Sequence, residues 1–260
     1  MNRIASVFSQ RDHKALIPYV TVGYPTIEAT LKVVPLLAKS GADIVELGIP
    51  FSDPLADGVT IQKSSFQALQ QGISPRSCID IAKQLRAKVD IPLVFMTYYN
   101  PVFHYGLEQF CTACVGAGID GLIIPDLPPQ EGADLEAVTK KQDLDLIYLL
   151  APTSNEERIK LVGQRSRGFI YLVSVTGVTG ARDKLPADLE AFVSRVKESV
   201  AQPLCVGFGI STPAQAKRVA LLADGVIVGS RIIQLMESSD LQQVGEFIKG
   251  LRQALGSTTT

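Results

Sequence analysis

Eight short apolar segments recur along the chain, and each is followed by a stretch with a helical pattern. They span residues 16–23, 42–50, 91–98, 121–127, 145–152, 168–174, 203–210 and 225–230. Near-continuous apolar strands that alternate with helices predict parallel strands covered on both faces. Eight such units in 260 residues predict an α/β fold of the (β/α)8 TIM barrel type. The alternative is a doubly wound open sheet, which lacks its usual Gly-x-Gly-x-x-Gly after the first strand.

Local signals predict where several helices begin and end. Thr26, Ser154 and Thr212 each stand before an amphipathic stretch as N-cap residues, and Pro213 follows the last of them. Three glycines mark helix ends just before the next strand, namely Gly41, Gly118 and Gly225. The first ten residues have the spacing of a short amphipathic helix, so we expect an extra N-terminal helix. Residues 1–260 are expected to form a single barrel domain.

Composition excludes several classes of protein. The net charge is −1 with no basic stripe, which argues against nucleic-acid binding. No apolar run approaches the ~20 residues of a membrane span, and the N-terminus lacks the apolar core of a signal peptide. Four cysteines do not make a disulfide framework in a chain of this size. Cys111 and Cys114 are expected to lie on a helix and to face the protein core. We expect a cytoplasmic protein.

The two histidines, His13 and His104, are far apart in the sequence. This spacing argues against a histidine triad or a histidine-based metal site, and no metal is expected. Histidines in solvated loops are the default interpretation of both residues.

The segment 42–50 carries one carboxylate, Glu46, in the middle of an apolar strand. Strand alternation places Ile44, Glu46 and Gly48 on the same face. A lone buried carboxylate is costly unless it is paired or used, so a structural salt bridge is the alternative interpretation. Asp57 follows in what reads as a polar loop. Two carboxylates in unlike environments can have different pKa values, which suits one to act as an acid and the other as a base. This pair is the predicted catalytic centre.

Glycines follow the last two strands, where barrels commonly bind phosphate. Gly207, Gly209 and Gly229 allow close approach to backbone N–H groups, and helical turns after Ile210 and Ser230 would direct their positive ends at an anion. Tight turns alone would also explain these glycines. The segment 174–186 is either a mobile lid or a plain surface connection. No lysine lies at a predicted strand end, which argues against a Schiff-base aldolase.

Several motifs together resemble the tryptophan synthase alpha chain family over nearly the whole chain. They are the stretch from Glu46 to Gly58, Tyr19-Val-Thr-Val-Gly, the stretch from Tyr171 to Gly180, Gly207-Phe-Gly-Ile-Ser and Gly229-Ser230. The resemblance implies a lyase that cleaves indole-3-glycerol phosphate to indole and glyceraldehyde 3-phosphate by a retro-aldol reaction. It also implies that this chain carries no cofactor.

The resemblance assigns a role to each matching residue. Glu46 matches the general acid–base, and Asp57 matches the carboxylate that holds the indole N–H and stabilises positive charge on the ring. The implied substrate-binding residues are Tyr19, Met96, Tyr98, Ile123, Pro125, Leu150, Tyr171 and Thr179, the last closing the lid toward Asp57. The implied phosphate-binding residues are Gly180, Phe208, Gly209, Gly229 and Ser230. The departures are Tyr19 where Phe is frequent, and Met96 and Pro125 where Leu and Ala are expected, which alter the pocket shape.

The resemblance further implies a partner, a beta chain that holds pyridoxal phosphate, in an alpha2-beta2 heterotetramer. The residues that match its interface are Pro50, Ser52, Asp53, Asn100 and Phe103. Two alternatives remain open: a free-standing indole-3-glycerol phosphate lyase, and a weakly catalytic subunit that mainly activates its partner. A sugar-phosphate isomerase or epimerase is a third, but such enzymes typically need a site lysine, a site histidine or a metal cluster.

Overall fold

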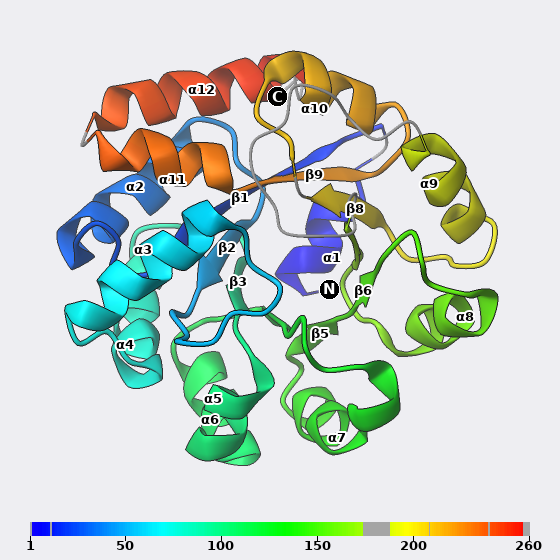
Figure 1. The fold of residues 1–260 in the computed structure, drawn as a ribbon, viewed down its shortest axis with the longest axis horizontal. Coiled ribbons are helices and arrows are strands. Elements are labelled where there is room, and N and C mark those ends of the chain that lie inside the picture. Colours follow the sequence, from blue (N-terminus) through cyan, green and yellow to red (C-terminus); the bar gives the residue numbers. More distant parts are fainter. Residues whose placement is uncertain (1, 11, 174–187, 208, 239, 257–260) are drawn as a thin grey trace.

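The computed structural model describes residues 2–10, 12–173, 188–207, 209–238 and 240–256. Its strands form one parallel sheet in the order β5-β4-β3-β2-β1-β9-β8-β7-β6. They are β1 Ala15–Thr21, β2 Val45–Gly48, β3 Leu93–Met96, β4 Gly121–Ile123, β5 Asp145–Ile147, β6 Leu149–Leu150, β7 Ile170–Val173, β8 Leu204–Gly207 and β9 Gly225–Val228. Only Tyr148 separates β5 from β6, so the two ends of the order are parts of one strand and the sheet closes into a barrel (Figure 1). The predicted fold is confirmed.

The fifth predicted strand is broken at Tyr148, which the sequence did not predict. The backbone N–H of Tyr148 donates to the hydroxyl of Ser166 at 3.0 Å rather than to a neighbouring strand. Its phenol donates to Glu136 at 2.6 Å, outside the barrel wall. The N–H of Tyr148 therefore leaves the strand ladder, while its carbonyl still accepts from the N–H of Tyr171 on β7 at 3.0 Å.

Helices surround the barrel, and α1 lies at its centre in the view of Figure 1. They are α1 Arg3–Phe8, α2 Ile27–Lys39, α3 Val59–Gln70, α4 Pro75–Arg86, α5 Tyr99–Tyr105, α6 Leu107–Gly116, the 3-10 helix η1 Pro129–Glu131, α7 Ala133–Lys141, α8 Glu156–Arg165, α9 Leu189–Lys197, α10 Pro213–Ala220, α11 Ser230–Glu237 and α12 Leu241–Ala254. The expected N-terminal helix is α1. Its Ile4 is fully buried and packs on Gly121 and Gly168, so α1 covers the amino-terminal end of the strands.

Most of the predicted helix boundaries are confirmed. The hydroxyl of Thr26 accepts from the N–H of Ala29, and Thr212 forms a capping box with Gln215. Gly41 and Gly118 end their helices with φ of +106° and +79°, a backbone conformation that suits glycine.

Two boundary predictions are wrong. Asn155, not Ser154, caps α8, because the Ser154 hydroxyl instead accepts from the N–H of Ala151. Gly225 is the first residue of β9 and not a helix terminus, since α10 already ends at Ala220.

Three aspartates tie neighbouring strands together at the amino-terminal end of the barrel. Asp43, Asp120 and Asp224 stand just before β2, β4 and β9, and each backbone N–H donates to a carbonyl on the preceding strand of the sheet. The leucine that supplies this carbonyl also donates its own backbone N–H to the side chain of the same aspartate. The pairs are Asp43–Leu16 at 2.7 Å, Asp120–Leu93 at 2.9 Å and Asp224–Leu204 at 2.9 Å. These reciprocal bonds fix the register of neighbouring strands at the amino-terminal end of the barrel.

The prediction for His13 is wrong. Its side chain is 5% exposed and its Nε2 lies 2.8 Å from Oδ1 of Asp43, whose other oxygen accepts from Arg252 at 2.8 Å. The partner comes from a distant part of the chain, so local composition did not indicate it. His104 is exposed, as expected, but lies in α5 rather than in a loop.

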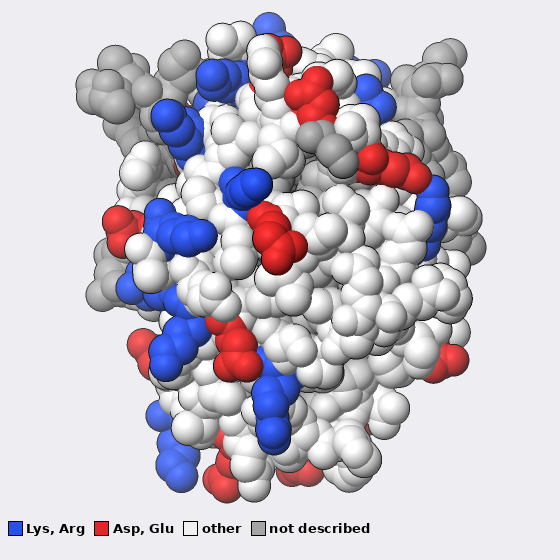
Figure 2. Space-filling view, turned by 90° about the vertical axis from the view of Figure 1, so that its left-hand side faces the viewer, with Lys and Arg blue, Asp and Glu red and all other residues white. Residues whose placement is uncertain are grey.

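The cysteine prediction is confirmed: Cys111 and Cys114 are buried on α6, and all four cysteines are free. Acidic and basic side chains are interspersed on the side of the barrel that carries α2, α3 and α4, where a broad area bears no charge (Figure 2). Within the described residues, no helix is both long and apolar enough to cross a membrane.

Candidate active site

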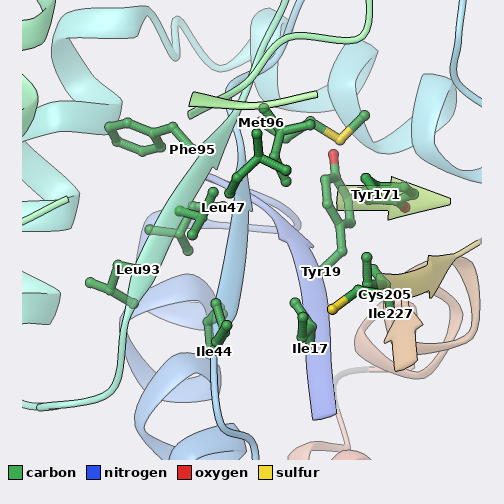
Figure 3. Packing of buried hydrophobic residues seen from close by; sticks show 14 of the residues in the cluster. Ile17, Tyr19, Ile44, Leu47, Leu93, Phe95, Met96, Tyr171, Cys205 and Ile227 are labelled. Carbon is green, nitrogen blue, oxygen red and sulfur yellow. The ribbon is translucent and has the colours of Figure 1, made fainter. Parts of the chain in front are cut away.

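A pocket opens at the carboxyl ends of the strands, where the side chains of four elements converge. Glu46 comes from β2, Met96 from the end of β3, Tyr171 from β7 and Asp57 from the loop that leads into α3. Tyr19 of β1 pairs in register with Glu46, so both side chains point into the barrel. Figure 3 shows Tyr19, Met96 and Tyr171 close together at this end of the barrel, while Leu93 and Phe95 extend to the other side of β3. The predicted catalytic pair thus shares one pocket.

Glu46 is buried without a counter-charge. The residue is 1% exposed, and neither carboxyl oxygen has a hydrogen-bond partner among the described residues. Burial raises the pKa of Glu46 to about 8, and the charge of Asp57 adds to the shift. Glu46 therefore forms no structural salt bridge with the described residues. Its carboxyl is protonated at neutral pH.

Asp57 lies in the predicted loop but is buried, which corrects the expectation of a polar environment for this carboxyl. The residue is 7% exposed, because its loop folds over the barrel end: the hydroxyl of Tyr98 accepts from the N–H of Ala56 at 3.0 Å. The Gln62 side chain donates to the carbonyl of Asp57 at 2.8 Å. Burial raises the pKa of Asp57 to about 6, and the Tyr98 hydroxyl opposes this shift. At neutral pH Asp57 is mainly ionised while Glu46 is mainly neutral, so the two carboxyls still differ in charge.

Two glycines make room for the tyrosines of the pocket. A Cβ at Gly48 would overlap the hydroxyl of Tyr19, and a Cβ at Gly207 would overlap that of Tyr171. Both glycines lie on the strand next to the tyrosine that covers them. Their lack of a side chain lets each phenol reach across the neighbouring strand toward the carboxylates.

The opposite wall of the pocket suits an anion. Gly229 and Ser230 line it at the start of α11, for which the described residues supply no side-chain cap, so the N–H groups of Ser230 and Arg231 remain available there. Gly209 also lines the pocket, with φ of +80°. These three positions are where the sequence predicted phosphate binding.

The second helix expected at this anion site does not contribute. The side chain of Gln215 accepts from the N–H groups of Ser211 and Thr212 at 2.8 and 3.1 Å, so the start of α10 is already capped. No helical turn follows Ile210 directly, because α10 begins at Pro213. The expectation of two open helix ends is wrong, because of these two helices only α11 begins without a side-chain cap from the described residues.

The remaining predicted substrate residues lie around this pocket without lining it. Ile123 and Leu150 are buried on β4 and β6, Pro125 follows β4, and Tyr98 covers the Asp57 loop. Thr179, Gly180, Phe208 and the predicted lid, residues 174–186, lie outside the described residues.

Five lining residues were not predicted as site residues: Ile61, Ile210, Ser211, Ile227 and Arg231. Alternation along the last strand could have identified Ile227, which faces the barrel interior like Gly225. Ile61 and Arg231 lie in the first turns of α3 and α11, just after predicted site residues. A prediction that each helix begins directly after these site residues would have placed both side chains near the pocket. Nothing local marks Ile210.

The predicted interface residues lie next to the site; Ser52, Asp53, Asn100 and Phe103 are exposed, whereas Pro50 is buried. Pro50, Ser52 and Asn100 line one groove between the loop after β2 and α5. Ser52 donates to Asp53 at 2.5 Å, and Phe103 of α5 is 65% exposed. Among the residues that the structure describes, no group of His, Cys, Asp and Glu could hold a metal ion.

Comparison with known proteins places the chain. The family model described as tryptophan synthase alpha chain matches residues 6–255. A tryptophan synthase alpha chain of Dehalococcoides mccartyi is 59% identical over 256 residues, which cover 98% of this chain and all of the relative. The fold superposes with a TM-score of 0.91 on tryptophan synthase subunit alpha of Legionella pneumophila, 39% identical, over 98% of each chain. Tryptophan synthase of Mycobacterium tuberculosis gives 0.92 at 37% identity, again over 98% of each chain.

Both the pocket chemistry and these likenesses agree with the family that the motifs suggested. The chain belongs to the tryptophan synthase alpha chain family, lyases of tryptophan biosynthesis that cleave indole-3-glycerol phosphate and carry no cofactor, pyridoxal phosphate being held by the beta chain.

Proposed function

We propose that Glu46 and Asp57 are the catalytic residues of the lyase reaction. The observation that carries the proposal is their joint burial in one pocket, with pKa values of about 8 and about 6. One carboxyl is therefore ready to donate a proton at neutral pH while the other carries a negative charge. Acid–base catalysis needs such a pair near the working pH.

Glu46 performs both proton transfers in this proposal. Its neutral carboxyl donates a proton to carbon 3 of the indole ring. The resulting carboxylate then removes the proton of the adjacent side-chain hydroxyl as the carbon–carbon bond breaks, releasing indole and glyceraldehyde 3-phosphate. The carboxyl ends protonated, as it began.

Asp57 acts on the other end of the indole ring. Its carboxylate accepts the ring N–H and stabilises the positive charge that develops when carbon 3 is protonated. Because the site is buried, this electrostatic stabilisation is stronger than it would be in water.

The substrate lies between the two ends of the pocket. Tyr19, Met96 and Tyr171 contact the ring, and the described apolar wall continues through Ile61 and Ile227. The phosphate binds to Gly209, Gly229 and Ser230 at the start of α11. By the family resemblance, Tyr98, Ile123, Pro125 and Leu150 complete the indole pocket, Gly180 and Phe208 the phosphate site, and Thr179 the closed lid.

The chain is further proposed to assemble with a beta chain into an alpha2-beta2 heterotetramer. Solved relatives bear the titles tryptophan synthase and tryptophan synthase subunit alpha, which support a second kind of chain. The groove at Pro50, Ser52 and Asn100, with Asp53 and Phe103 beside it, is the proposed contact. Exposed apolar side chains adjoin it at Leu55 and Val59, which are 90% and 71% exposed.

Two further proposals concern the chain as a whole. Residues 1–260 form one domain, since the strands close into one barrel with one buried core. The protein works in the cytoplasm, which its four free and buried thiols support.

The test is indole release from indole-3-glycerol phosphate by the purified chain, alone and with a beta chain added. Slow release that rises strongly with the beta chain supports both the reaction and the complex. Release that is fast and unchanged by the beta chain would favour the free-standing lyase. Absence of release under both conditions would contradict the proposed chemistry.

A further inference from the structure

One buried tyrosine contacts both ends of the loop that carries Asp57. This Asp57 loop, residues 49–58, connects β2 to α3. At its start the ring of Phe51 stacks on the ring of Tyr98, with 5.1 Å between the centroids and 28° between the planes. Near its end the backbone N–H of Ala56, the residue before Asp57, donates to the Tyr98 hydroxyl at 3.0 Å. Tyr98 is 3% exposed, so both contacts are shielded from water.

The backbone on both sides of Tyr98 is bonded to the barrel. Tyr98 lies between β3 and α5, where it is the N-cap residue of the helix. The N–H of Thr97 donates to the carbonyl of Ile123, the last residue of β4, at 3.0 Å. The N–H of Tyr99 donates to Asp126, in the loop after β4, at 2.9 Å. The side chain of Tyr98 therefore offers the Asp57 loop a fixed support.

The hydroxyl of Tyr98 also has a hydrogen to donate. The N–H of Ala56 uses only a lone pair of this oxygen, and a phenol can accept and donate at the same time. Burial first and the charge of Asp57 second raise the pKa of Tyr98, so the phenol keeps its proton. The hydroxyl is hydrogen-bonded to the side chain of Asp57, which lowers the pKa of this carboxyl against the larger effect of burial.

These contacts give Tyr98 a task in the site. We infer that Tyr98 is a positioning residue, whose ring and hydroxyl hold the Asp57 loop at both ends and thereby fix the Asp57 carboxyl in the pocket. The inference deepens the proposed function and rests on it. Tyr98 is not among the described residues that line the pocket, so this role acts through the loop and through Asp57.

Other described groups also surround Asp57. Gln62 of α3 holds the carbonyl of Asp57, but not its carboxyl, at 2.8 Å. Asp126 faces Tyr98 from the loop after β4. The titratable or charged side chains that share the pocket with Asp57 are Tyr19 of β1, Glu46 of β2, Tyr171 of β7 and Arg231 of α11. Within the described residues, the Ala56 N–H donates to Tyr98 alone, so loss of this hydroxyl removes a single, defined support.

The first measurement is hydrogen–deuterium exchange of the Ala56 amide by NMR in the parent, Tyr98→Phe and Tyr99→Phe. Tyr98→Phe keeps the ring that stacks on Phe51 and removes only the hydroxyl. Tyr99→Phe is the matched control, because the Tyr99 hydroxyl has no hydrogen-bond partner among the described residues. The Ala56 amide should exchange at least about tenfold faster in Tyr98→Phe and at the parental rate in Tyr99→Phe. Equal rates in all three proteins would overturn the inference.

The kinetics of indole release test the consequence for Asp57. In Tyr98→Phe, kcat should fall about tenfold while KM changes less than about threefold, because a misplaced charge affects the transition state more than substrate binding. The parent should lose kcat/KM below about pH 6, where Asp57 becomes protonated. In Tyr98→Phe the carboxylate lacks a donor, so this acid limb should move up by about one pH unit. A merely structural loss would lower activity without moving the limb, and an unmoved limb would overturn the inference.

A carbon-13 NMR titration of the Asp57 carboxyl, assigned with Asp57→Asn, tests the inference without turnover. Its pKa should rise in Tyr98→Phe and stay at the parental value in Tyr99→Phe. If Tyr98→Phe fails to fold, Phe51→Leu removes the stacked ring from the loop side and should also speed exchange of the Ala56 amide; an unchanged rate there would overturn the inference. A chain that releases no indole but shows the faster exchange and the raised pKa would contradict the proposed function alone.

Discussion

Burial of the Glu46 carboxyl has a thermodynamic consequence as well as a chemical one. Its pKa is raised from an ordinary value of 4.5 to about 8, so the folded state holds this proton more tightly than the unfolded state. The stabilising contribution is complete below pH 4.5 and is lost as the pH rises toward 8. The same residue that supplies the acid therefore destabilises the fold at alkaline pH.

Glu46→Gln removes both effects, because the amide neither donates an acidic proton nor ionises. Indole release should fall by at least about a hundredfold while substrate binding remains. In urea unfolding, the variant should gain stability over the parent as the pH rises from 5 to 8.5, by on the order of 4 kcal/mol at most. An advantage that is equal at both pH values would contradict the buried, ionisable state of Glu46, and near-parental turnover would contradict its catalytic role.

Ser230→Asp tests the anion site at the start of α11. The new carboxylate lies beside the proposed phosphate position, so like-charge repulsion should raise KM for indole-3-glycerol phosphate about tenfold or more, with a smaller change in kcat. Ser238→Asp places the same charge at the other end of α11 and serves as the matched control. A KM that responds equally to both substitutions would locate the phosphate elsewhere.

At the scale of elements, side chains that lie outside the strands fix the register of the strands. Asp120 accepts from the N–H of Leu93 and from Arg86, both at 2.9 Å, and its other oxygen accepts from Arg3 at 2.9 Å. It thereby joins β3, β4, α4 and the N-terminal helix. Truncation would leave the buried Leu93 N–H and the Arg86 guanidinium without this partner, which is costly.

Asp120→Ala should therefore lower the free energy of unfolding by about 2–4 kcal/mol in urea titration. Asp80→Ala is the control, because Asp80 is exposed on α4, and its change should stay within about 0.5 kcal/mol. Because Asp120 lies at the opposite end of the strands from the pocket, KM should change little in both variants. A loss no larger than that of the control would show that the aspartate bonds do not set strand stability.

The elements that could be predicted are those whose signals are local. Thr26 and Thr212 cap helices through bonds within one turn, and apolar runs mark every strand regardless of its neighbours. The failures depend on distant partners. The break at Tyr148 requires Ser166 and Glu136, and the burial of His13 requires Asp43.

The same distinction holds for the pocket. Glu46, Gly229 and Ser230 could be placed because barrel topology brings strand ends together whatever the loop details. The burial of Asp57 and the closed cap of α10 could not be predicted. They depend on how Tyr98 and Gln215 turn, which is decided by packing in the folded molecule.

At the scale of the whole molecule, the proposed beta-chain contact lies outside the pocket, so it can be weakened without touching the catalytic pair. Phe103 is 65% exposed on α5, and Phe103→Ala should remove apolar contact area from that interface. The basal rate of indole release should be unchanged, while half-maximal stimulation should require about tenfold more beta chain. Leu221→Ala, at the end of α10 and 79% exposed, is the control for loss of a surface apolar side chain. Equal stimulation of both variants and the parent would exclude Phe103 from the interface, whereas a lowered basal rate in Phe103→Ala would show that α5 supports the pocket itself.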